Sequence, residues 1–395
     1  MIANATMVYP ISGYQIQFTL HREFPWIKCN LKLSPNSLHR FEYTPLYTGC
    51  VSEYTNVQPG QIDLGGGYLE SFGFNSVKAS PIEKDLMQIE YDDKSTIFKL
   101  CDVMGSSGAA PAAFIENIDP KLKDLLACFN YWPVMNTTQK SNFLSFADGG
   151  TIEDTGIVAL LQRNVQKIVA FISASESFLT YLDNPKKQAQ SGTKGMLDPD
   201  SISLDIRQLF GKGNYSWFGK EWDFQVFDGN KFNSLVEGFQ EKLNAGETVM
   251  YRDTYTVQPN SFFGLKGGNE VEVLWVYNNQ VANWENSLNN EVKSLIEFPF
   301  PNYHTFFPPD GGSKKLVAEF FDTAGALVDE TLETAWDDFV SWLTGTKAKQ
   351  MNYDWVKVSI IKMNAPETSL LSHLSYWNVV NDNSAKEFRY MLGSD

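Results

Sequence analysis

Asn142-Phe-Leu-Ser-Phe-Ala-Asp-Gly-Gly-Thr151 begins the stretch of sequence from which the fold can be predicted. An apolar, strand-like run ends there on Asp148, and the two glycines after it provide the backbone freedom for a tight turn. A short amphipathic helix follows up to Arg163, and residues 167–173 form a second apolar run. This order is typical of a β-loop-α-β unit with Asp148 at the carboxyl end of a strand. Open α/β sheets place their functional groups at that position.

The other segments extend this pattern over the whole chain. We predict an α/β fold with a mostly parallel sheet flanked by helices on both faces, in a single domain over residues 1–395. A polar connector within residues 181–235 is too long for an ordinary connection, and we interpret this region as a lid or an insertion. Periodicity predicts strands at 41–49, 270–277 and 355–361, and helices at 280–296, 316–343 and 383–392.

Composition excludes some classes of partner. The chain of 395 residues has a net charge of −15, whereas a nucleic-acid-binding protein needs a basic face. The same charge disfavours electrostatic docking on anionic membranes and leaves neutral or zwitterionic lipid surfaces open. The sequence contains no apolar run of membrane-spanning length and no secretory signal, so cytoplasm and endomembranes both stay open. The four cysteines lack metal-type spacing, and we expect neither a metal nor a cofactor.

Four short motifs resemble those of one enzyme family, in that family's order. Phe41-Glu-Tyr-Thr-Pro45 resembles a Phe-Glu-Phe-Thr/Ser-Pro segment, and Gly67-Tyr-Leu-Glu-Ser-Phe-Gly73 corresponds to a loop that ends in Phe-Gly-Ser. Gly105-Ser-Ser-Gly-Ala-Ala-Pro-Ala-Ala-Phe114 resembles a Thr-Ser-Ala-Ala-Pro-x-x-Phe helix, and the triplet at Asp148 resembles an Asp-Gly-Gly motif. The chain is similar to the patatin-like and cytosolic phospholipase A2 superfamily of lipid acyl hydrolases, well over about residues 35–180 and loosely elsewhere.

This resemblance implies a two-residue catalytic site. In the family, a serine on a tight strand-to-helix turn attacks an ester carbonyl, and an aspartate accepts its proton in place of a histidine. The resemblance assigns that aspartate to Asp148 and the supporting turn to Gly149 and Gly150. A carboxylate is an adequate base only where burial and its neighbours raise its pKa. The implied substrate is a phospholipid or another lipid ester at a membrane or micelle surface.

The chain departs from the family pattern at the nucleophile. The family has a Gly-Gly-Gly-x-Arg oxyanion loop and a Gly-x-Ser-x-Gly elbow before the first motif, and residues 1–40 contain neither. Ser107 could substitute as the nucleophile, but no apolar strand precedes it, so we expect a packing residue in a helix. The glycines Gly65, Gly66 and Gly67 could substitute as the oxyanion loop, although no basic residue follows them. We therefore expect a carboxyl-terminal portion of a lipid hydrolase that holds the aspartate and lacks the serine.

Three functions stay open at this level. The leading hypothesis is a phospholipase or lysophospholipase with Asp148 as the base of the dyad, weak or inactive as this chain alone. The alternative is a non-catalytic lipid-binding or scaffold relative of the same fold. The third candidate is a carbohydrate enzyme in which Asp148 works with a second carboxylate. The sequence places no second acidic residue convincingly for this role. Asp148 in a plain Asp-Gly turn without a function is the simplest interpretation. The oligomeric state and the lipid head group stay open.

Overall fold

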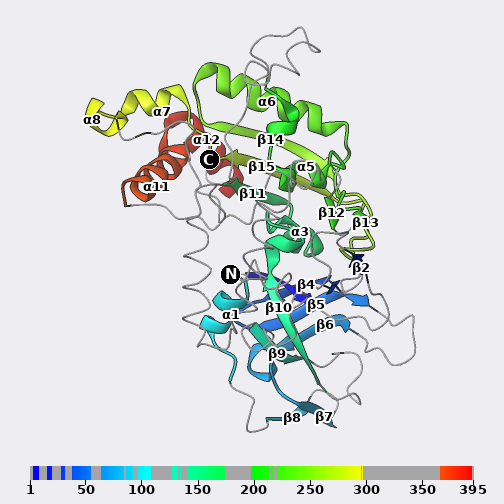
Figure 1. The fold of residues 1–395 in the computed structure, drawn as a ribbon. Coiled ribbons are helices and arrows are strands. Elements are labelled where there is room, and N and C mark those ends of the chain that lie inside the picture. Colours follow the sequence, from blue (N-terminus) through cyan, green and yellow to red (C-terminus); the bar gives the residue numbers. More distant parts are fainter. Residues whose placement is uncertain are drawn as a thin grey trace. The chain divides into compact units, whose positions relative to one another are not determined.

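The structure is a computed structural model of the chain (Figure 1). None of the helices in the described part is long and apolar enough to cross a membrane. The chain divides into two compact units, which we describe separately. Unit 1 comprises Met1–Asn164, Asn214–Val226 and Val257–Gly268, and unit 2 comprises Val165–Gly213, Phe227–Thr256 and Asn269–Asp395. The described residues are 3–8, 16–19, 28–31, 38–54, 64–83, 86–91, 97–107, 127–131, 134, 141–173, 197–213, 215–217, 220–294, 296 and 365–393.

Unit 1 is built on a six-stranded antiparallel sheet with the strand order β6-β5-β4-β1-β10-β9. Its central strand β1 lies between β4 and β10, far from both in sequence. The sheet strands are β1 (Ala3–Val8), β4 (Leu38–Tyr43), β5 (Tyr47–Tyr54), β6 (Leu64–Glu70), β9 (Ala127–Tyr131) and β10 (Asn142–Asp148). The other elements are β2 (Ile16–Thr19), β3 (Lys28–Leu31), η2 (Ser71–Gly73), β7 (Lys78–Glu83), β8 (Leu86–Glu90), α1 (Leu100–Ser107), η4 (Gly149–Thr151), α3 (Ile157–Gln162), β12 (Tyr215–Trp217) and β13 (Lys220–Trp222).

The two faces of this sheet carry different chemistry, because successive side chains of a strand point to opposite faces. On one face lies an aromatic cluster, in which the Phe41 and Phe146 rings meet edge to face at 5.0 Å between centroids. Val103 of α1 packs against this cluster, and α1 contacts β1, β9 and β10. Figure 1 shows α1 beside β10 and β9. On the other face, between Phe41 and Tyr43, Glu42 points toward α3 and is bound by Arg163.

The sheet around Asp148 corrects the predicted topology. Helices and strands are mixed as an α/β fold requires, but the sheets are small and mostly antiparallel. Strand β10 has two antiparallel partners, β1 and β9, and does not pair with β11 (Lys167–Ile172). The chain does run strand, turn, helix, strand from β10 to β11, as predicted. The two strands belong to different sheets because β1, a distant segment, occupies the position beside β10 that a parallel neighbour would take.

Unit 2 contains the parallel pairing. Its three-stranded sheet has the order β11-β15-β14, with β11 parallel and β14 antiparallel to the central β15. Almost every side chain of β15 from Val271 to Tyr277 is buried, as expected for a strand covered on both faces. The elements are β11, η5 (Pro199–Ser201), α5 (Leu204–Leu209), α6 (Lys231–Ala245), β14 (Val249–Thr256), β15 (Glu270–Tyr277), α7 (Ala282–Ser287), α8 (Asn290–Lys293), α11 (Ala365–Val380) and α12 (Asp382–Leu392).

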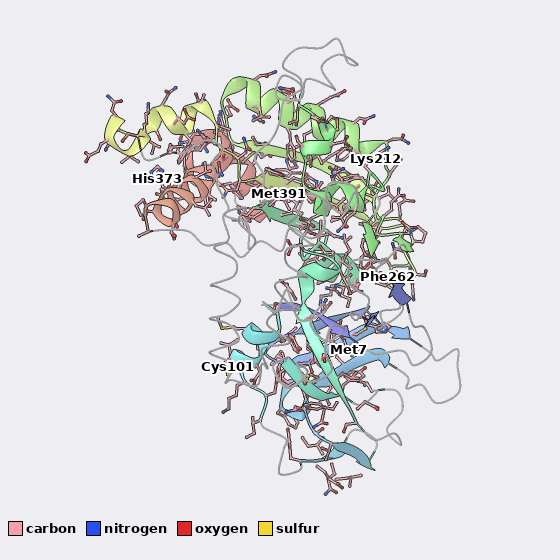
Figure 2. The ribbon with its side chains drawn as sticks, viewed as in Figure 1. Met7, Cys101, Lys212, Phe262, His373 and Met391 are labelled. Atoms are coloured by element: carbon pink, nitrogen blue, oxygen red, sulfur yellow. The ribbon has the colours of Figure 1, made fainter. Side chains whose placement is uncertain are left out.

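Two aromatic side chains fix helices in unit 2. The Tyr390 ring of α12 contacts two cations, with Lys167 Nζ and Arg252 Cζ each 4.1 Å from its centroid. Trp284 of α7 is fully buried, and its Nε1 donates a hydrogen bond to His373 Nδ1 of α11 at 3.0 Å. Figure 2 shows His373 and Met391 on these helices. The final helix and the 270–277 strand therefore form as predicted.

Other predicted elements differ from the structure or lie outside it. The strand predicted at 41–49 is two strands, because Pro45 falls in the turn between β4 and β5. The helix predicted at 280–296 is the short pair α7 and α8, interrupted at Leu288, which has an extended backbone. The predicted helix at 316–343 and strand at 355–361 lie outside the described residues, as do residues 181–196 of the predicted insertion.

Candidate functional site

Asp148 is the last residue of β10, so its predicted position at the end of a strand is confirmed. It lies two residues beyond Phe146, and its side chain therefore projects to the aromatic face against which α1 packs. Asp148 caps the turn η4, and its Oδ1 accepts a hydrogen bond from the Gly150 N–H at 3.0 Å. The turn thus holds the carboxylate in a fixed orientation.

The environment of Asp148 increases the ability of its carboxylate to accept a proton. Burial raises the pKa of this carboxyl, and the hydrogen bond from Gly150 offsets part of the rise. A carboxylate with a raised pKa holds a transferred proton better than an exposed one does. A Cβ atom at Gly150 would lie 2.7 Å from Asp154 Oδ1, so a larger residue there would displace the exposed Asp154 side chain, whereas its 3.6 Å distance from Asp148 Oδ1 is an ordinary contact.

Ser107 lies in the helix that covers this face. It is half-buried and lies in α1, which confirms that it belongs to a helix. Residues 97–99, which precede α1, form no strand, so the strand-turn-helix context of a nucleophile elbow is missing at this position. The neighbouring Ser106 is buried, and its hydroxyl donates to the Asp102 carbonyl oxygen at 2.8 Å.

The three glycines proposed for an oxyanion loop lie elsewhere in the sheet. Gly65, Gly66 and Gly67 belong to β6, at the sheet edge, and the Gly65 N–H donates to the Tyr131 hydroxyl at 2.6 Å. Three strands separate β6 from β10, which corresponds to roughly 19 Å at the usual strand spacing. The sheet does not bring these glycines together with Asp148.

The opposite face of the sheet holds a buried ionic cluster, which we call the Glu42 cluster. Glu42 is fully buried and receives an ion pair from Arg40 and another from Arg163, whose Nη2 lies 2.6 Å from Glu42 Oε2. Tyr68 donates to the same carboxylate oxygen at 3.1 Å, and Arg163 also reaches the Tyr47 hydroxyl at 3.0 Å. Burial alone would raise the pKa of Glu42, but the charge of Arg40 and the arginine hydrogen bonds outweigh it and lower that pKa.

Glu153 is a second buried carboxyl near Arg40, with the opposite pKa shift. Burial raises its pKa more than Arg40 and the hydrogen bonds from Thr155 and Val158 lower it. Because folding raises the pKa of Glu153, its protonated form contributes its full stabilisation below the pKa of the unfolded state, near 4.5. That contribution is lost as the pH rises through the pKa of the folded state. Glu153 therefore costs stability at neutral pH.

We expect Glu153→Gln to remove this loss. The amide keeps an acceptor for Val158 and carries no charge, so the variant should gain stability relative to the parent as the pH rises from 5 to 8. Hydrogen exchange of the amides in β4 and α3 at both pH values measures the effect. A variant that is destabilised more at pH 8 than at pH 5 would contradict this prediction.

The Glu42 cluster was not predicted from the sequence. One signal was present, because the alternation of Arg40, Phe41, Glu42 and Tyr43 on a strand separates charged from aromatic residues. The partner Arg163 lies 121 residues away in the sequence, and no local pattern connects it to Glu42.

Comparison with known proteins gives no further guide to the site. The chain matches no protein-family model, no curated protein and no solved structure. Among the described residues, no group of three or more His, Cys, Asp or Glu side chains could hold a metal ion. Any function must therefore be inferred from the side chains around Asp148 and from the family resemblance of the sequence motifs.

Proposed function

We propose that the protein is a lipid acyl hydrolase in which Asp148 is the general base. The observation that carries this proposal is the carboxylate itself. It ends a central strand, a backbone N–H orients it, and burial raises its pKa. The four sequence motifs that resemble patatins and cytosolic phospholipases add the substrate class, an ester of a phospholipid or lysophospholipid.

In the proposed reaction, Asp148 accepts the proton of a serine hydroxyl while the serine oxygen attacks the ester carbonyl. The collapse of the tetrahedral intermediate expels the alcohol, and water then releases the fatty acid from the acyl-serine. Gly149 and Gly150 keep side chains away from the carboxylate, so that the substrate can approach it closely. A base is required because an isolated serine hydroxyl is too weakly acidic to attack.

A non-catalytic lipid-binding protein is the second candidate function. Supporting it, α1 and Ile97, three residues before it, expose large apolar side chains beside the Asp148 face, with Ile97 69% and Met104 69% exposed. Leu100 lies between them and is also exposed. Apolar side chains on one surface suit contact with a lipid surface whether or not hydrolysis follows.

Release of labelled fatty acid from phosphatidylcholine micelles tests the two functions. The full product of the gene is assayed for hydrolysis, and its co-sedimentation with phosphatidylcholine vesicles is measured in parallel. Hydrolysis that requires Asp148 supports the first proposal. Vesicle binding without hydrolysis would leave the non-catalytic function, and neither activity would overturn both.

Ser107 is expected not to be the nucleophile. It lies in helix α1, and residues 97–99 before this helix form no strand, so the strand-turn-helix context that exposes a nucleophilic serine is missing there. A fluorophosphonate probe followed by peptide mapping should therefore leave Ser107 unmodified, and Ser107→Ala should keep the rate of hydrolysis. Labelling of Ser107 that is lost in Asp148→Asn would show instead that the two residues form the dyad.

A further inference from the structure

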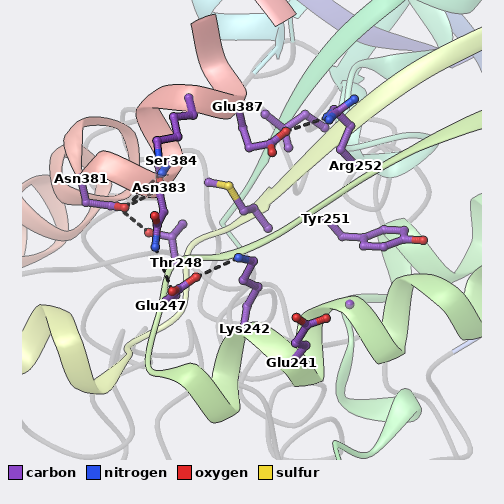
Figure 3. A pocket seen from close by; sticks show the side chains of 14 residues that line it. Glu241, Lys242, Glu247, Thr248, Tyr251, Arg252, Asn381, Asn383, Ser384 and Glu387 are labelled. Carbon is purple, nitrogen blue, oxygen red and sulfur yellow. Dashed lines mark hydrogen bonds and ion pairs between the residues drawn. The ribbon is translucent and has the colours of Figure 1, made fainter. Parts of the chain in front are cut away.

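Unit 2 contains a pocket of its own, lined by none of the residues of the candidate functional site. Its volume is about 520 Å³, and it is formed by α6, β14 and the first half of α12 (Figure 3). The buried side chains Met250 and Leu274 provide its apolar lining. A volume of this size is within the range of small-molecule sites, about 300–1,000 Å³.

The charges that line the pocket are balanced. Three carboxylates and three cationic side chains face it, although the whole chain carries a net charge of −15. Two ion pairs lie on different sides, Lys242–Glu247 at 2.8 Å and Arg252–Glu387 at 2.6 Å (Figure 3). The balance disfavours a ligand with a large charge of one sign, since such a ligand would meet as much repulsion as attraction.

Two charged groups of opposite sign are left over. Within the described part of the chain, neither Glu241 of α6 nor Lys386 of α12 has a hydrogen bond or an ion pair. Figure 3 shows Glu241 on the same side of the pocket as Tyr251. The Tyr251 ring packs directly on Gly238, where a Cβ atom would lie 2.1 Å from Tyr251 Cδ2. This contact places the ring against α6, about one helical turn from Glu241, and a carboxylate with a tyrosine ring is a suitable site for an ammonium group.

We propose that this pocket binds a small zwitterion, with its ammonium group at Glu241 and Tyr251 and its phosphate or carboxylate group at Lys386. The Lys242–Glu247 and Arg252–Glu387 ion pairs line the walls, and because the charges within each pair neutralise each other, the walls favour neither sign of charge. The proposal does not depend on Asp148 or on hydrolysis. The anionic group could come from a phosphate or from a carboxylate, and the two sources are distinguished below.

Isothermal titration of the full chain with four compounds tests the proposal. Phosphocholine and betaine carry both charges, whereas choline and inorganic phosphate carry one each. Saturable binding of at least one zwitterion is expected, with choline and phosphate at least about fivefold weaker because each forms only one of the two contacts. Preference for phosphocholine or for betaine identifies the anionic group. Equal binding of choline or phosphate, or no binding of either zwitterion, would overturn the proposal.

Variants of the two unpaired groups assign the binding to this pocket. Glu241→Gln and Lys386→Gln should each weaken zwitterion binding about fivefold, the upper range for an exposed charge contact. Glu291→Gln and Lys293→Gln on α8 remove the same charges outside the pocket and should leave the affinity unchanged. Thermal melting confirms that all four variants fold. Affinity that is unaffected by both pocket variants would place the binding elsewhere and refute the assignment.

Discussion

Replacing Asp148 with asparagine should lower the hydrolysis of phospholipid esters about 10²- to 10⁴-fold, the usual contribution of a general base. Asparagine keeps the size of the side chain and an oxygen that can accept the hydrogen bond from Gly150. The fold should therefore persist while the proton acceptor is lost. Release of labelled fatty acid by the full product of the gene measures the effect, with circular dichroism as the test of folding.

Asp228→Asn is the matched control. The Asp228 side chain accepts a hydrogen bond from the N–H two residues ahead, at 2.9 Å, as Asp148 does, but it is exposed and lies in unit 2. It should keep the parent rate. Equal rates for Asp148→Asn and the parent would remove Asp148 from the mechanism.

The rate should also depend on pH in a defined direction. Only the ionised carboxylate accepts a proton, so activity should fall as the pH decreases through the pKa of Asp148. Because burial raises that pKa, the acid limb of the rate profile should lie above 3.8, the ordinary value for aspartate. A profile that is flat down to pH 4 would argue against a buried carboxylate as the base.

Glu42→Gln should destabilise unit 1 by about 3 kcal/mol, the lower end of the range for breaking a buried ion pair. The variant leaves the cationic groups of Arg40 and Arg163 without their shared carboxylate, and the side chain of Arg40 is only 7% exposed. The expected loss of stability is at the lower end of that range because Glu153 still interacts with Arg40 in the variant and compensates part of its charge. Hydrogen exchange of peptides from β4 and β10, followed by mass spectrometry, reports on this unit directly.

Glu70→Gln provides the comparison, since Glu70 is exposed on β6 of the same unit and should change stability by less than about 0.5 kcal/mol. The contribution of Glu42 should also disappear in acid. Because folding lowers the pKa of Glu42, its ionised form contributes its full stabilisation above the pKa of the unfolded state, near 4.5. That contribution is lost as the pH falls through the pKa of the folded state. A Glu42→Gln variant as stable as Glu70→Gln would show that the ionic cluster makes no net contribution.

Local sequence patterns predicted much of the neighbourhood of Asp148. Strand β10, the turn after it, helix α3 and strand β11 are all present, because each depends on apolar periodicity and glycine placement over a few residues. The pairing of these strands was predicted incorrectly. One partner of β10 is β1, about 140 residues away, and no local signal specifies a pairing over such a distance.

In the candidate site, too, local features were predicted from the sequence and long-range features were not. The position of Asp148 at a strand end follows from its sequence, whereas the raised pKa depends on the sheet and helix that bury it. Gly65, Gly66 and Gly67 suggested a loop because glycine is usually depleted in strands. They form β6 instead, because β5 pairs with them and provides the backbone hydrogen bonds.

The sheet of unit 1 separates two carboxylates for which we propose different roles. Asp148 projects from one face and Glu42 from the other, so a layer of backbone lies between the proposed reaction and the ionic cluster. Substitutions at Glu42 are therefore expected to change stability, and substitutions at Asp148 to change the proposed reaction. The two effects are coupled through the segment after β10, because Glu153 lies five residues from Asp148 and interacts with Arg40 of the Glu42 cluster.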